Sequence, residues 1–218
     1  MKKADINVIY KILKEEVKSY KVPVVDLIEI QTKDPFKVLI TTILSSRTKD
    51  KVTMRAAKRL FRKIDKPQDL VKLSTKQIEK LIYPVGFYKT KAKHLKLFPK
   101  VLTEEFNNKI PKTLDELTNL PGVGRKTADL VLAVAFNKPA ICVDTHVHKI
   151  MNRLGYVKTK NPLQTEMILR KKLPREYWVT INSIFVAFGQ QTCTPISPFC
   201  SKCPVSKYCD KVGVDKSR

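Results

Sequence analysis

Apolar residues recur at three- and four-residue spacing along most of the chain, and this period predicts helices. The first helix is predicted to span about fifteen residues from a set of apolar positions with Lys and Glu between them: Ile6, Ile9, Leu13 and Val17. A proline-containing connection follows around Pro23. Asp34 is then a suitable cap for a helix that begins at Pro35 and continues through the apolar run 36–44.

Helical patterns continue through the rest of the chain, separated by Pro, Gly, Ser or Asn. The predicted segments are 49–63, 75–82, 90–106, 113–119 and 125–136, a helix after Asp144, the segment 162–172 and a last long helix from Pro174. A strand is indicated only at the short segment 140–143, which has no alternating partner nearby. The pattern therefore predicts an all-α protein.

The net charge and composition of the chain limit the classes of protein to which it can belong. The chain has 218 residues, with 43 Lys and Arg against 20 Asp and Glu and a formal net charge of +23. This excess exceeds what a small domain needs for solubility and indicates a polyanionic partner, with nucleic acid first. Hydrophobic residues make up 43% of the chain, so the chain as a whole is not a disordered basic tail. Neither a run of about 18 apolar residues nor a signal-peptide core occurs, so we expect an intracellular protein of the cytoplasm or nucleoid that does not associate with a membrane.

A glycine-containing turn lies between the two predicted helices 113–119 and 125–136. Its glycines permit a tight turn that points backbone amides outward at a helix start, where a phosphate oxygen can bind. Such a helix-hairpin-helix grips the DNA backbone without reading sequence, although an ordinary interhelical turn capped by glycine is the simpler alternative. The residues that would contact DNA are Gly122, Val123, Gly124 and Arg125.

Lys126 lies just inside the start of the second helix of this hairpin. The positive end of the helix dipole disfavours an ammonium there, so the amine is a candidate nucleophile. A lysine that merely contacts a phosphate would occupy the same position.

Asp144 follows the apolar segment 140–143 and precedes a predicted helix. An aspartate in this position is a common helix cap. A helix start also keeps a carboxylate ionised, so that it can stabilise positive charge on a sugar or activate a nucleophile. One residue can fill both roles.

Four cysteines lie within seventeen residues in the spacing C-x6-C-x2-C-x5-C: Cys193, Cys200, Cys203 and Cys209. Four thiolates suit either tetrahedral zinc or a [4Fe–4S] cluster. A single short pair flanked by wider gaps favours the cluster, because zinc modules usually show two short pairs. Cys142, far upstream in an apolar run, is expected to be a small buried hydrophobic residue.

These features together resemble the endonuclease III family, the bifunctional DNA glycosylase/AP lyases of the helix-hairpin-helix, Gly/Pro, Asp superfamily. The resemblance covers nearly the whole chain, including Leu-Ser-Ser-Arg-Thr-Lys-Asp at 44–50 and Gly-Phe-Tyr-Lys-Thr-Lys-Ala at 86–92. It implies a [4Fe–4S] cluster on the four cysteines, Lys126 as the Schiff-base nucleophile and Asp144 as the catalytic carboxylate. It also implies a six-helix domain over 28–138 and a cluster domain built from 1–27 and 139–218.

Two departures from the family pattern concern substrate choice. Arg47 stands where bacterial members carry Gln, and Phe87 stands where they carry Leu. By resemblance both residues face the gap that a flipped nucleotide leaves, with Phe87 stacking and Arg47 bonding the opposite base. Lys202 and Lys207 would place positive charge of the cluster loop against DNA.

The implied function is base excision repair by a monomer. The enzyme would remove oxidised or reduced pyrimidines from duplex DNA and cut 3′ to the abasic site. One alternative is a glycosylase for uracil or thymine mismatched with guanine, which Arg47 could permit. A non-catalytic DNA-binding module with a four-cysteine metal site would also be basic, but it would not need Lys126 and Asp144 together.

Overall fold

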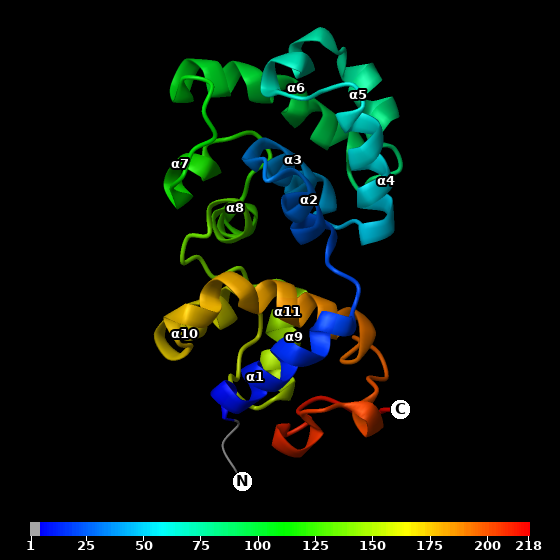
Figure 1. Ribbon diagram of the computed structural model, residues 1–218, viewed down its shortest axis with the longest axis vertical. Coiled ribbons are helices and arrows are strands. Elements are labelled where there is room, and N and C mark those ends of the chain that lie inside the picture. The colour runs from blue at the N-terminus through cyan, green and yellow to red at the C-terminus, as the bar shows by residue number, and fades with distance from the viewer. Residues whose placement is uncertain (1–4) are drawn as a thin grey trace. The chain divides into compact units, whose positions relative to one another are not determined.

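The computed structural model describes residues 5–218, and within them the chain is helical without strands, which confirms the all-α prediction (Figure 1). The α-helices are α1 (Ile6–Glu16), α2 (Val24–Thr32), α3 (Pro35–Ser45), α4 (Asp50–Phe61), α5 (Thr75–Ile82), α6 (Tyr88–Phe106), α7 (Leu114–Thr118), α8 (Arg125–Phe136), α9 (Thr145–Arg153), α10 (Pro162–Lys172) and α11 (Trp178–Gln191). Short 3-10 turns supplement them at Val17–Ser19, Pro67–Lys72, Arg175–Tyr177, Cys200–Lys202 and Ser206–Tyr208. None of the helices in residues 5–218 combines the length and hydrophobicity that crossing a bilayer requires.

The helices form two compact units. One unit is continuous and comprises residues 24–138, which hold α2 to α8. The other combines the chain up to Pro23 with Pro139–Arg218, and holds α1, α9, α10, α11 and the four-cysteine loop.

Helix α3 is the centre of the unit 24–138. Seven consecutive residues of α3, from Val38 to Leu44, are buried, and the helix packs against α2, α4 and α8. Helix α6 packs against α5 and contacts α3, and α7 packs against α8 (Figure 1). A helix buried on nearly all sides needs an almost continuous apolar run, which is what residues 36–44 supply.

The unit built from both ends of the chain has its own core. Helix α1 packs against α11, and α11 packs against α9. Between them lies a cluster of buried side chains that includes Ile9, Leu13, Ile150, Phe185 and Phe188. The segment that leads to Asp144, residues 140–143, is buried beside these helices in an irregular conformation. Asn182 of α11 donates a hydrogen bond to the carbonyl oxygen of Cys142 (3.2 Å), which gives this buried backbone group a partner.

The structure differs from the prediction at one missed helix and at two helix ends. The connection around Pro23 leads directly into α2, a nine-residue helix that buries Val24, Val25 and Ile28. The first helix ends at Glu16 and tightens into a 3-10 turn instead of continuing for about fifteen residues. A 3-10 turn likewise separates Pro174 from the last helix, which begins at Trp178. The segment 140–143, the best strand candidate of the sequence, forms no strand, in agreement with the all-α prediction, because a lone apolar segment has no neighbouring strand to pair with.

Candidate nucleic-acid interface and thiol pocket

The hairpin is present between α7 and α8. Its turn is closed by a hydrogen bond from the Val123 amide to the Leu120 carbonyl (3.1 Å), and Gly122 has a left-handed backbone with φ of 79°. Gly124 occupies the N-cap of α8 with extended backbone. Glycine has no side chain with which to bond the first amides of α8, so these amides can bind an external anion.

The turn of the hairpin lies against α6. A Cβ atom added to Gly122 would meet Nδ1 of His94 at 2.8 Å, and nothing lies within 4 Å of a Cβ added to Gly124. Gly122 is therefore required both for its backbone conformation and for its close approach to His94, whereas Gly124 borders open space.

The two predicted catalytic residues occupy the starts of two helices. Lys126 is exposed in the first turn of α8. Asp144 is half-buried at the N-cap of α9, where its carboxylate accepts hydrogen bonds from the amides of His146 and Val147, both at 2.9 Å. The predicted cap is thus confirmed. Lys126 belongs to the unit 24–138 and Asp144 to the other unit.

Arg47 and Phe87 are both held in the left-handed region of backbone space, with φ of 53° and 57°. This conformation is uncommon for residues other than glycine and persists only where neighbouring structure imposes it. Phe87 is 62% exposed, and the guanidinium carbon of Arg47 lies 5.4 Å from the centre of its ring. An exposed aromatic ring and an exposed cation therefore stand together on the unit 24–138.

Lys91 is a residue of this region that sequence reasoning missed. It is buried in the first turn of α6, and its ammonium donates hydrogen bonds to the carbonyl oxygens of Leu44 (2.9 Å) and Ser46 (2.6 Å). Burial lowers the pKa of Lys91 to about 8 because it disfavours the charged form. The signal was present in the sequence, because Lys91 continues the apolar face of α6 at helical spacing with Leu95, Phe98 and Leu102.

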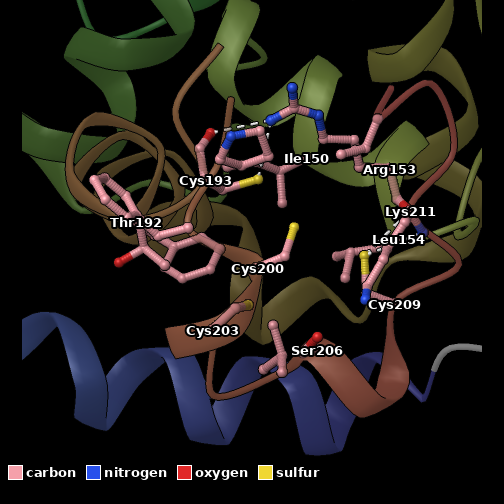
Figure 2. A pocket seen from close by; sticks show the side chains of 15 residues that line it. Ile150, Arg153, Leu154, Thr192, Cys193, Cys200, Cys203, Ser206, Cys209 and Lys211 are labelled. Atoms are coloured by element: carbon pink, nitrogen blue, oxygen red, sulfur yellow. Dashed lines mark hydrogen bonds between the residues drawn. The ribbon is translucent and has the colours of Figure 1, made fainter. Parts of the chain in front are cut away.

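The four box cysteines, all unpaired and partly exposed, line one pocket of the unit built from both chain ends. Figure 2 shows them around this pocket together with Ile150, Leu154 and Arg153 of α9. As the side chains stand, no group of three or more Cys, His, Asp or Glu residues within residues 5–218 is arranged to hold a metal ion. Cys142 is instead buried in the core, as predicted.

The thiols share an apolar environment. Burial raises the pKa of Cys203 to about 11 and also raises the pKa of Cys193 and of Cys209, because a thiolate is poorly solvated there. Charge repulsion among the box cysteines contributes to each of these pKa increases. Ionisation of one box cysteine therefore disfavours ionisation of the others.

Arg153 holds one side of the thiol pocket in place. Its buried guanidinium donates to the carbonyl oxygens of Thr194 (2.8 Å) and Pro195 (2.9 Å) and lies 3.3 Å from the sulfur of Cys193 (Figure 2). Elsewhere in the segment 193–209, Lys202 and Lys207 are exposed, as a contact with DNA phosphates would require.

Comparison with known proteins identifies the relatives of this chain. Residues 40–175 match the family described as HhH-GPD superfamily base excision DNA repair protein. Endonuclease III of Thermotoga maritima is 46% identical over 177 residues, which cover 81% of this chain and 83% of that protein.

Solved structures give the same result. A non-covalent endonuclease III–DNA complex superimposes with a TM-score of 0.86 at 32% identity, covering 97% of this chain and 96% of the other. A trapped endonuclease III–DNA covalent intermediate, an estranged-adenine complex, gives a TM-score of 0.77 at 37% identity, with 82% and 84% covered.

The two hairpin glycines give a matched pair of substitutions. Gly122→Ala should lower the free energy of unfolding by about 1–2 kcal/mol, because it forces alanine into a left-handed conformation, and the added Cβ atom would also crowd His94. Gly124→Ala should change it by no more than about 0.5 kcal/mol, because the N-cap preference for glycine over alanine is offset by the entropy that alanine removes from the unfolded chain. Urea unfolding of both variants measures this difference, and equal losses would contradict the geometry of the turn.

Proposed function

The chain belongs to the endonuclease III family within the HhH-GPD superfamily of base excision DNA repair proteins, and on that premise we propose that Lys126 and Asp144 are its catalytic residues. The protein is a DNA glycosylase with AP lyase activity. We propose duplex DNA that carries oxidised or reduced pyrimidines as its substrate, and a monomer as its active form.

One observation carries the assignment of Lys126. The lysine is exposed in the first turn of α8, directly after a glycine turn whose amides can grip a backbone phosphate. A hairpin that fixes a phosphate also fixes the attached sugar, so an adjacent amine can reach a sugar carbon.

The proposed reaction has two stages. In the first, the neutral amine of Lys126 attacks C1′, the glycosidic bond breaks, and the damaged base leaves with the bonding electrons and takes up a proton. In the second, the adduct nitrogen loses a proton and the C1′–O4′ bond of the sugar ring opens, with O4′ taking up a proton, to give an imine. The imine allows loss of a proton from C2′ and elimination of the 3′-phosphate. The base must first leave the helix, because C1′ is shielded inside the stack.

Asp144 serves the first stage. Its half-buried carboxylate, held by two amides of α9, can accept the proton that the Lys126 ammonium must lose, or it can stabilise positive charge on the sugar. The same two hydrogen bonds stabilise the ionised form, so the cap and the catalytic role support each other.

DNA contacts are proposed at three places. The hairpin residues Gly122 to Arg125 bind a phosphate, and Lys202 and Lys207 contribute charge from the cysteine loop. Arg47 and Phe87 fill the gap that the flipped nucleotide leaves, because a stacked aromatic ring recovers about 1–3 kcal/mol of lost base stacking. Arg47 has donors for the unpaired opposite base.

We assign a [4Fe–4S] cluster to Cys193, Cys200, Cys203 and Cys209. Four soft sulfur ligands that line one pocket fit this group. When bound, the cluster would supply four metal–sulfur bonds that cross-link residues 193–209. The loop would thereby hold Lys202 and Lys207 in position, and neither proposed stage of the reaction depends on an electron from it.

Replacement of Lys126 by glutamine should abolish the covalent protein–DNA adduct that borohydride traps on a lesion-bearing duplex, because an imine requires an amine. Duplex affinity should remain within a few fold, since one lost charge among many costs little. The matched control is Lys76→Gln, which removes another exposed positive charge, on α5, and should leave trapping unchanged. Efficient trapping by the Lys126 variant would identify another amine as the nucleophile.

Asp144→Asn separates charge from capping, because asparagine caps a helix as well as aspartate does. We expect base release to fall at least about 100-fold, the lower range for general acid–base catalysis, with the melting temperature nearly unchanged. Asp34→Asn alters the corresponding cap of α3 and should leave activity intact. A stability loss in the Asp144 variant without a loss of base release would leave only the capping role.

Iron analysis tests the cluster. Protein purified anaerobically from iron-replete cells should contain about four irons per chain. Replacing any of the four box cysteines by serine should lower that content, whereas Cys142→Ala should not, since Cys142 is buried away from the pocket lining. Stoichiometric zinc in a colourless preparation would overturn the assignment.

A further inference from the structure

The segments that carry Arg47 and Phe87 contact each other directly. The amide of Gly86 donates to Oγ1 of Thr48 (3.1 Å), and a Cβ atom added at Gly86 would lie only 2.5 Å from the carbonyl oxygen of Arg47. The two backbones therefore meet at a point where only glycine fits. The positions of Arg47 and Phe87 are consequently coupled.

Lys91 provides the second connection between these loops. Its own amide bonds the carbonyl oxygen of Phe87 (3.0 Å) in the first turn of α6. Its ammonium bonds the carbonyl oxygens of Leu44 and Ser46, at the end of α3 and immediately before Arg47. The Lys91 side chain thus connects the start of α6, which Phe87 precedes, to the backbone segment that leads into Arg47.

The chemistry of this connection is specific. The last carbonyls of a helix have no intrahelical partners and carry partial negative charge, so an ammonium satisfies them well. Burying that ammonium costs solvation, whereas an apolar side chain would fill the same space without this cost. A buried lysine here is better explained by the geometry it imposes than by a contribution to stability.

The connected residues border one surface. Ser46, Arg47, Phe87, Lys91 and the hairpin residue Gly122 line an open hollow of about 270 Å³ in the unit 24–138. Side chains that fill the DNA gap and a turn that grips phosphate therefore share a single face. Small displacements of the Arg47 loop on this face would change what Arg47 can reach.

We propose that Lys91 is a positioning residue that fixes Arg47 relative to Phe87 and thereby sets how strongly the enzyme discriminates among bases opposite the lesion. The proposal rests on the proposed function, in which Arg47 contacts that opposite base. Lys91 itself need not touch DNA.

The test compares Lys91→Met with Lys96→Met. Lys96 lies on the same helix, and its ammonium also bonds two carbonyl oxygens, those of Val71 and Leu73, both at 2.8 Å. Base release is measured for one lesion opposite each of the four bases, and strand cleavage is measured at a pre-formed abasic site. Lys91→Met should change the ratio between the best and worst opposite base by about tenfold, a loss comparable to that of a charge-assisted hydrogen bond. The rate of cleavage at the abasic site should stay within a few fold of that of the unaltered protein. Lys96→Met should leave the ratio between the best and worst opposite base unchanged.

Two further variants keep the test decisive. Lys91→Arg retains donors and should recover part of the discrimination. Thr48→Val removes the bond to Gly86 without touching the buried lysine, so it should shift the ratio in the same direction even if Lys91→Met folds poorly. The positioning role would be overturned if base release slowed equally opposite all four bases. It would also be overturned if the ratio between the best and worst opposite base stayed unchanged in both Lys91→Met and Thr48→Val. Absence of base release by the unaltered protein would instead contradict the proposed function.

Discussion

Helix ends leave backbone amides and carbonyls without partners inside the helix, and the hairpin, Asp144 and Lys91 lie at three such ends. The N-cap Gly124 gives the first amides of α8 no capping side chain, the Asp144 carboxylate accepts from those of α9, and the Lys91 ammonium donates to carbonyls at the end of α3. Anions suit the first two positions and a cation suits the third, as the direction of the helix dipole requires. The polarity of the backbone therefore favours a bound anion at the start of α8, the Asp144 carboxylate at the start of α9 and the Lys91 ammonium at the end of α3.

Local chemistry in the sequence was sufficient to predict much of this arrangement. The glycine turn, the cap at Asp144 and the burial of Cys142 each follow from residue type and neighbours within a few positions. Helix α2 could not be predicted in the same way. Its buried residues Val24, Val25 and Ile28 form no extended helical repeat, and the helix is stabilised largely by its packing against α3.

The remaining features depend on contacts between distant segments. Nothing in the sequence around Arg47 or Phe87 favours a left-handed backbone, which occurs where the segments holding Arg47 and Gly86 approach each other closely. Lys91 was overlooked because lysine is usually exposed, although its spacing with Leu95 and Phe98 placed it on the buried face. In the cysteine loop, regular structure is limited to two short 3-10 turns, so its conformation depends on partners such as Arg153.

The constrained backbone at Arg47 and Phe87 bears on how the enzyme would search long stretches of undamaged DNA. A non-specific complex held by phosphate contacts can slide along the duplex. In the role proposed for them, the constrained backbone of both residues would let the protein test each base pair without a loop becoming ordered and with little loss of conformational entropy. The time spent at an intact base pair would then depend on how readily that pair opens, which is the property that distinguishes a damaged or mismatched base from its neighbours.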